Sequence, residues 1–396
     1  MRPLNRAATG ALLVAVFIVA LVYGAQFPIL PLLLERSLGS PTAAATNTGL
    51  LAGVYAFALF LFAPLWGRIS DRWQRRGVII VGLVGLAFAL MLLRAFDRIV
   101  ALYMGEFLAG AFSAAVLPGA LALVADSSPD EDWRGRRFAW LNIANLAGFL
   151  IGPVLGGLLG AMWQGEMPVS GAPFTFLSVG AVLSAAGAHL LLPRRSTRPD
   201  RRVMAPRNRA ALRLLLPCAG LVALGLGTFE VGLTIRGLQQ LRLTPAEVGF
   251  MFAECMVIMA ASQLIVFNRW FPVRTTRWLL APAFIVFAIA LLMLPLAASA
   301  TKLFWAVAAV GASAGVLSPV IAFWISLNAG QGQGRKLGWQ AAAASFGLGV
   351  GSVLGGLSLG TIGPLHLPFV IAAAAGLLGA LLTAAFAVQP ARHVRL

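Results

Sequence analysis

The chain has 396 residues, of which 60% are hydrophobic and 11% charged, and its net charge is +17. A soluble domain carries roughly 25% charged residues, so this composition excludes an ordinary soluble protein and indicates a membrane protein. The placement of the positive charges also argues against nucleic-acid binding, because 24 of the 30 lysines and arginines fall in alternate segments between apolar runs.

Apolar segments follow one another along the chain, beginning with the uncharged run Gly10–Leu34. About 20 such residues span a bilayer, and a helix pairs their backbone amides within the segment. The predicted spans are 8–34, 45–66, 77–96, 99–124, 137–161, 172–192, 212–235, 246–268, 277–298, 301–326, 336–360 and 366–388. We therefore expect an all-α integral membrane protein with 12 transmembrane helices.

The bias of lysine and arginine predicts the orientation of these spans. With the N-terminus in the cytoplasm, the 24 clustered positive residues all lie on the inner side, so both termini are expected there. The first apolar run is longer than the 7–15 residues of a signal-peptide core, so it is expected to be the first span.

The sequence contains no recognisable constellation for catalysis. Cys218 and Cys255 both lie inside predicted spans and have no metal-ligand or disulfide spacing, and the three histidines are dispersed. The phosphate-binding pattern G-x-x-x-x-G-K-[ST] does not occur. We therefore expect no enzyme activity, no cofactor, no resident metal and an energy source other than ATP.

The second half of the chain repeats the first. Residues 148–157 read GFLIGPVLGG and residues 347–356 read GLGVGSVLGG, with six identical positions. Residues 49–70 align with 249–270 at an offset of 200, and the offset near the first helix is 204. Duplicated, glycine-interrupted spans are typical of transporters, whose ligand site lies near midplane between the repeats. The predicted domains are a six-helix bundle at 1–193, a basic cytoplasmic linker at 194–211 and a second bundle at 212–396.

Three segments resemble known transporters. Residues 67–76, GRISDRWQRR, resemble the major facilitator superfamily signature G-x-L-A-D-R-x-G-R-K, with Gln74 in place of a glycine. The run Gly148-x-x-x-Gly152-Pro153-x-x-Gly156-Gly157 resembles the antiporter signature of drug/proton exporters in that superfamily, and residues 23–31 are similar to the tetracycline-exporter type. The resemblance covers the whole chain and implies the major facilitator fold and drug/proton antiport.

Two positions depart from that resemblance. Exporters of this type carry an arginine on span four, four residues before a glycine, and this chain has Glu106 ahead of Gly110. The acidic residue that several relatives carry on span one is absent, and Gln26 lies nearby instead. The relatives' rules for proton coupling and substrate therefore do not transfer directly.

The spacing of the glycines in the antiporter signature also predicts how this helix packs. Gly148, Gly152 and Gly156 recur every four residues on one helix face, which allows a neighbouring helix to approach closely. Pro153 removes one backbone hydrogen bond and favours a kink. We expect a seal or rocking point between the two halves here, and plain helix packing is the alternative.

The signature near the second span predicts a cytoplasmic gate. The resemblance implies that Arg75 pairs with Asp126 and that Asp71 faces the start of span eleven, where a carboxylate gains roughly 0.3–1 kcal/mol from the helix dipole. The alternative is an ordinary solvated charged loop. The gate residues are Gly67, Asp71, Arg72, Arg75, Asp126, Arg335 and Lys336.

Three carboxylates, Glu106, Glu230 and Glu254, fall inside predicted spans and toward the outer half of the membrane. A charge there costs about 2.5–3.5 kcal/mol, so it usually faces a cavity and has a function. The offset of 204 relates Glu230 to Gln26. Removal from water favours the protonated form, so we expect proton coupling, with Glu254 and Glu230 ahead of Glu106. A static ion pair is the alternative, and Arg94 is the candidate partner of Glu106.

Polar and aromatic residues predict the lining of a substrate cavity. Tyrosine rings with a few polar groups suit a flat organic ligand. For Tyr103 in particular, the aromatic belt at the membrane interface is an equal alternative. The predicted cavity residues are Tyr23, Gln26, Tyr55, Tyr103, Asn142, Asn145 and Gln340.

These features together favour a monomeric, proton-coupled exporter of small amphipathic organic molecules in the bacterial inner membrane, working by alternating access. The acidic cavity favours a cationic, zwitterionic or neutral substrate. The alternatives are export of an endogenous metabolite such as a siderophore or sugar, an uptake symporter, and a membrane scaffold or sensor that transports nothing. The sequence leaves the substrate, the proton stoichiometry and the conformational state open.

Overall fold

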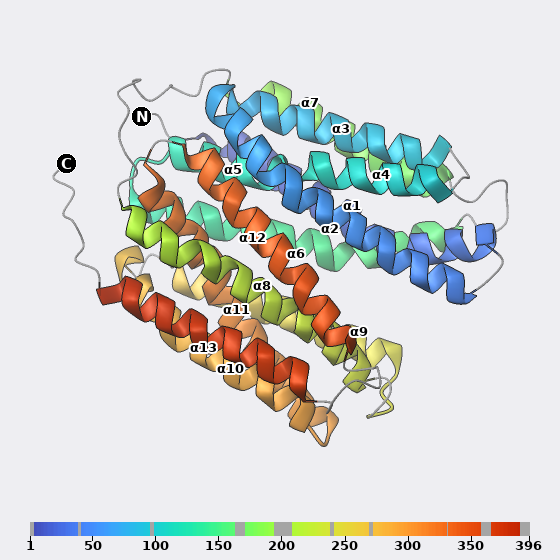
Figure 1. Ribbon diagram of the computed structural model, residues 1–396. Helices are drawn as coiled ribbons and strands as arrows, with labels where there is room; N and C mark the ends of the chain where they lie inside the picture. The colour runs from blue at the N-terminus through green and yellow to red at the C-terminus, as the bar shows by residue number, and fades with distance from the viewer. Residues whose placement is uncertain are drawn as a thin grey trace. The chain divides into compact units, whose positions relative to one another are not determined.

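The computed structural model describes residues 4–38, 41–95, 99–162, 171–193, 208–237, 241–268, 272–330, 332–357 and 366–388. This described part consists of helices and their connections, without a strand (Figure 1). The helices are α1 Arg6–Leu38, α2 Pro41–Arg72, α3 Arg75–Ala95, α4 Ile99–Ser113, α5 Val116–Asp126, α6 Glu131–Met162, α7 Gly171–Leu191, α8 Arg209–Ile235, α9 Pro245–Val266, η2 Val273–Thr275, α10 Thr276–Leu296, α11 Ala300–Ala329, α12 Gln333–Leu357 and α13 Leu367–Val388.

The described residues include 12 helices or helix pairs that are long and apolar enough to cross a membrane, which confirms the predicted fold class. The predicted fourth span is divided into α4 and α5 by a turn at Ala114–Ala115. Pro118 lies in the first turn of α5, where its missing N–H leaves the Ala114 carbonyl without its usual partner. The span is therefore broken just before the proline, whereas Pro319 lies inside the continuous helix α11.

Internal contacts divide the chain into two units. The first unit comprises Met1–Arg202 with Gly332–Ser345, and the second comprises Val203–Gln331 with Phe346–Leu396. The first part of α12 therefore belongs to the first unit and its remainder to the second. The predicted domain boundaries and the cytoplasmic location of both termini stay predictions, and most of the predicted linker, 194–207, lies outside the described residues.

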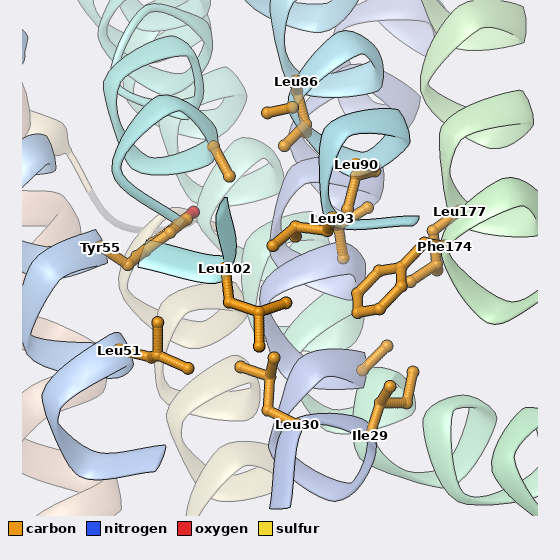
Figure 2. Packing of buried hydrophobic residues seen from close by; sticks show 14 of the residues in the cluster. Ile29, Leu30, Leu51, Tyr55, Leu86, Leu90, Leu93, Leu102, Phe174 and Leu177 are labelled. Carbon is orange, nitrogen blue, oxygen red and sulfur yellow. The ribbon is translucent and has the colours of Figure 1, made fainter. Parts of the chain in front are cut away.

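The first unit has an apolar core between α1, α2, α3, α4 and α7 (Figure 2). Its helices meet along three main pairs, α1 with α6, α3 with α7, and α2 with α4. The core is built from one face of each helix, because its leucines and phenylalanine recur three or four residues apart. The labelled members of the cluster are Ile29, Leu30, Leu51, Tyr55, Leu86, Leu90, Leu93, Leu102, Phe174 and Leu177.

In the second unit, α11 is the most enclosed helix and packs against α8, α9 and α10. Helices α10 and α13 lie side by side (Figure 1). Gly311 and Gly315 on α11 allow this enclosure, because a Cβ at either position would press on the α9 backbone at Cys255 or Met259. Small residues thus decide how closely α9 and α11 approach.

The glycines of the antiporter signature form a seam between α1 and α6, which both belong to the first unit and not to different halves. A Cβ on Gly148, Gly152 or Gly156 would clash with the α1 backbone. The α1 residues at these contacts are Phe17, Leu21 and Ala25. The fifth position differs, because a Cβ on Gly157 would meet nothing within 4 Å. Close packing therefore explains three of the glycines but not Gly157.

The second unit repeats this seam between α8 and the end of α12. Cβ atoms on Gly347, Gly351 and Gly355 would meet the α8 backbone at Gly220, Leu224 and Thr228. The α1 contacts at 17, 21 and 25 thus correspond to α8 contacts at 220, 224 and 228, which is a shift of 203 residues. Here Thr228 adds a bond that the first seam lacks, because its Oγ1 donates to the Gly351 carbonyl at 3.1 Å.

We expect Gly156→Ala to destabilise the protein and Gly157→Ala to leave it unchanged or slightly more stable. The added methyl at 156 meets backbone atoms that cannot rotate away, and such overpacking costs about 1–3 kcal/mol. The methyl at 157 meets open space, and alanine favours helix over glycine. Thermal unfolding in detergent measures the difference. Equal unfolding temperatures for the two variants would contradict the seam.

Candidate functional site

Two polar side chains lie within the apolar core of the first unit. Gln26 on α1 and Glu106 on α4 are 3% and 1% exposed. The Gln26 Nε2 donates a hydrogen bond of 2.8 Å to Glu106 Oε1. Arg94, the candidate ion-pair partner from the sequence, has an exposed side chain instead. The alternative of an ion pair with Arg94 is therefore not what the structure shows, because the partner of Glu106 is a neutral amide.

The tyrosines surround this pair in two arrangements. The rings of Tyr23 and Tyr55 stack with centroids 4.6 Å apart, and Phe149 packs at 5.9 Å from Tyr23. Tyr55 lies close enough to Glu106 for an electrostatic interaction. Tyr103 turns its hydroxyl to Asn47 and donates to Oδ1 at 2.8 Å. The three tyrosines therefore gather near Gln26 and Glu106, as a shared site requires.

The remaining predicted cavity residues lie elsewhere in the first unit. Asn142 donates to the Phe138 carbonyl of its own helix. Asn145 lies 11 residues before Gly156, the α6 residue that contacts α1 next to Gln26, which is about 16 Å along the helix axis. Gln340, on the first part of α12, has a buried Oε1 without a hydrogen-bond partner in the described part of the chain. The predicted set is thus not one cluster.

The second unit holds the other two carboxyl groups of the spans. Both carboxylate oxygens of Glu254 on α9 are buried and have no hydrogen-bond partner among the described residues. Cys255 lies close enough to both Glu230 and Glu254 for electrostatic interactions with each. The ring of Phe229, next to Glu230, packs edge-on against Phe252 at 6.0 Å. The two glutamates therefore have a common, largely apolar neighbourhood.

The helix contacts change which residue of the first half corresponds to Glu230 in the second half. The shift of 203 residues between the seams relates Gln26 to Phe229, and it relates Glu230 to Phe27. The offset of 204 expected from the sequence was therefore wrong at this depth. The Pro41–Pro245 match, which gives 204, lies beyond the end of the seam, where the spacing of the two halves differs by one residue. Glu230 does not replace Gln26.

The charged residues near the end of α2 form a buried network. Arg75 donates from Nε to Asp126 at 2.9 Å and from a terminal nitrogen to Asp71 at 2.7 Å. Its other terminal nitrogen donates to Ser70 at 2.7 Å. The Arg75 side chain is only 8% exposed, so water screens these interactions little. The pairing of Arg75 with Asp126 that the resemblance implied is present.

Asp71 also binds the N-terminus of α12, whose first part belongs to the same unit. Its two oxygens accept from the backbone N–H groups of Gly334 and Arg335, each at 2.9 Å. These are N–H groups that a helix leaves without internal partners, and the carboxylate opposes the positive end of the helix dipole. Gly67 and Gly334 allow the approach, because a Cβ on either would clash with the other's backbone.

The basic residues of the predicted gate take a smaller part in this contact. The side chains of Arg72 and Arg335 are exposed, and Lys336 is half-buried. Asp71 therefore holds α12 through the backbone N–H groups of Gly334 and Arg335. Sequence reasoning missed Ser70, although its place five residues before Arg75 in the signature is a usable signal.

These arrangements of helices, seams and charged residues are those of a known family. The sequence profile of the Major Facilitator Superfamily matches residues 12–229, which is more than half of the chain. The chain belongs to the major facilitator superfamily. Its structure agrees, because the crystal structure of the human organic anion transporter MFSD10 (TETRAN) superposes with a TM-score of 0.78 at 19% identity, covering 96% of this chain and 100% of that one.

Several curated members of the superfamily are similar to this chain. Multidrug resistance protein 1 of Bacillus subtilis (strain 168) is 24% identical over 362 residues, covering 87% of this chain and 88% of the relative. The quinolone resistance protein NorA of Staphylococcus aureus (strain MRSA252) is 22% identical and covers 86% and 87%. The class E tetracycline resistance protein of Escherichia coli is 35% identical, but over only 41% of this chain and 38% of its own length.

Membership of the major facilitator superfamily establishes a multi-pass membrane transporter rather than an enzyme. The two positions at which this chain departs from the exporters it resembles, Gln26 and Glu106, lie together, because their side chains are hydrogen-bonded to each other. Two further residues of the site, Asn47 and Phe149, carried no signal in the sequence. Their roles become visible only through their contacts with Tyr103 and Tyr23.

We expect Asp126→Ala to destabilise the protein by about 3 kcal/mol, because it removes one partner of a buried charge pair. Asp130→Asn is the matched control on the same connection. Asp130 is exposed and accepts from the Trp133 N–H, and asparagine caps a helix equally well. Thermal unfolding in detergent compares the two variants. A loss no larger for Asp126→Ala than for the control would show that the network is an ordinary solvated loop.

Proposed function

We propose that this transporter exports small amphipathic organic molecules, including drugs, across the bacterial cytoplasmic membrane in exchange for protons, by alternating access. The observation that carries the proposal is Glu254, whose carboxylate oxygens are both buried and without a hydrogen-bond partner in the described part of the chain. Two relatives named for drug resistance align over more than four-fifths of the chain, which supports the assignment to drugs.

Glu254 and Glu230 are the proposed proton carriers. A carboxylate removed from water without a partner is strongly unfavourable, so the group takes up a proton when dry and releases it when water reaches it. This alternation is what exchange of protons for substrate requires. The common neighbour Cys255 supports a joint role for the two groups, because both carboxyl groups lie close enough to interact with it.

The tyrosine cluster of the first unit is the proposed contact surface for the substrate. The stacked rings of Tyr23 and Tyr55 with Phe149 offer aromatic faces, and Tyr23 is half-buried rather than sealed. Aromatic faces with a few polar groups suit a flat organic molecule. Acidic rather than basic residues in the spans favour a cationic, zwitterionic or neutral compound over an anion.

The network of Asp71, Arg75 and Asp126 is the proposed cytoplasmic gate. Because Asp71 binds two N–H groups in the first turn of α12, release of that helix would break two charge-assisted hydrogen bonds at once. The bonds hold the beginning of a helix whose later part belongs to the other unit. A latch at this point therefore acts on a helix that both units share.

In proteoliposomes with an imposed pH gradient, an exported drug should cause proton release, and Glu254→Gln or Glu230→Gln should abolish it. The glutamine variants keep the size of the side chain and cannot exchange a proton in this pH range. A pH-sensitive dye and a labelled drug measure the two fluxes together. Expected proton movement in the variants falls at least tenfold, whereas drug binding in detergent persists.

The matched control is Glu247→Gln on the same helix, α9. Glu247 is exposed and completes a capping box with Thr244, which glutamine also forms. Wild-type proton movement in the Glu254→Gln variant, or drug flux that ignores the gradient, would contradict the proposal. Growth of an efflux-deficient host on a panel of drugs distinguishes a drug exporter from an exporter of an endogenous metabolite such as a siderophore or sugar, because only the former gives resistance.

A further inference from the structure

The hydrogen bond between Gln26 and Glu106 lies in largely apolar surroundings, where few groups can stabilise an ionised carboxylate. The two side chains are almost completely buried, and the bond joins α1 to α4 across 80 residues of sequence. Val22 and Leu30 lie one turn to either side of Gln26, and Leu102 and Ala109 flank Glu106. All four flanking residues belong to the apolar core of the first unit, so the surroundings of the pair are largely apolar apart from the nearby tyrosines.

The described side chains around this pair supply no positive charge. The titratable side chains in or against the core cluster around the pair are Tyr55 on α2, Tyr23 on α1 and Tyr103 on α4, and tyrosine ordinarily ionises only near pH 10. Helix α3 contributes Arg94, whose side chain is exposed. Glu106 is therefore the carboxyl group in this core that can exchange a proton, and the amide of Gln26 is its hydrogen-bond donor.

A donor of this kind favours one protonation state. The amide N–H can bond to either form of the carboxyl group, but a bond to the ionised oxygen is roughly twice as strong as one between neutral groups. Without this donor, ionised Glu106 would be a buried charge with no hydrogen bond from Gln26, which is strongly unfavourable. The Gln26 N–H therefore favours release of the Glu106 proton.

We propose that Gln26 is a positioning residue that holds Glu106 as a proton-releasing group inside the first unit, where it binds a proton and not the substrate. With 1% of its surface exposed, Glu106 offers no surface to a drug-sized molecule. The inference deepens the proposed function and rests on it, because it gives the first unit a proton site beside Glu230 and Glu254. Gln26 thus serves Glu106 rather than the ligand, contrary to the cavity role expected from the sequence.

The test replaces the donor without changing the size of the side chain. Gln26→Met keeps the length and removes the N–H, so Glu106 should lose its proton about one pH unit higher than in the wild type. The infrared absorption of protonated carboxyl groups, followed against pH, reports this directly. The contribution of Glu106 is the part that disappears in Glu106→Gln. The pH of half-maximal drug transport should move upward by the same amount.

The exchange of the two residues provides the second variant. Gln26→Glu combined with Glu106→Gln moves the carboxyl to α1 and its amide donor to α4, so the titrating signal absent from Glu106→Gln should return within about half a pH unit of the wild type. This comparison also stands if Gln26→Met does not fold. A returned signal that titrates like wild type supports the proposal, and one that fails to return overturns it.

Two results distinguish the positioning role of Gln26 from the proposed function of proton-coupled export. If Gln26→Met lowers thermal stability but leaves the infrared midpoint in place, Gln26 is only a structural contact between α1 and α4, and the positioning role is wrong. If the midpoint moves as expected while drug flux is independent of the proton gradient, proton-coupled export fails and the effect of Gln26 on Glu106 stands. A midpoint that moves to lower pH in Gln26→Met would mean that the Gln26 amide favours the protonated form of Glu106, and this would overturn the proposal.

Discussion

The constraint on which this structure depends is that polar groups inside the membrane must find partners within the protein. Backbone groups meet it by forming helices, and two helices can share a seam only where side chains are absent. The seams at Gly148–Gly156 on α6 and Gly347–Gly355 on α12 are the outcome. They bring backbones so close that no side chain fits between them. Polar side chains are then confined to the faces that the seams leave free, and these faces hold the candidate site.

The repeated halves satisfy the constraint in different ways. Both seams have glycine every four residues, but the first contains Pro153 and the second contains Ser352 at the matching place. The second seam instead gains the bond from Thr228 to the Gly351 carbonyl. A proline cannot donate, whereas a threonine hydroxyl can tie the two backbones together. The halves therefore share a packing geometry and differ in the polar contacts that act within it.

Much of the fold was predictable from the sequence because it depends on local patterns. Apolar length predicted the spans, and glycine spacing predicted the seam at Gly148, Gly152 and Gly156. The Gln26–Glu106 bond was not predictable, since it depends on how two helices are rotated about their axes. The equivalence of Glu230 with Gln26 failed for a related reason: an error of one residue turns a helix by about 100°. The dispersion of Asn142 and Asn145 from the tyrosines likewise follows from the register of α6 on α1.

The buried carboxyl groups of the two units differ in one respect that bears on coupling. Glu106 has an amide donor, and Glu254 has no hydrogen-bond partner in the part of the chain that the structure describes. A carboxyl group with a donor can exist ionised while it remains enclosed, because one strong bond replaces part of its hydration. A carboxyl group without one can ionise only when water enters. On the proposed function, Glu254 therefore changes its protonation state when its surroundings open, and Glu106 can do so while the first unit stays closed. Two proton sites of this kind respond to different events in one transport cycle, which a single exposed carboxylate cannot do.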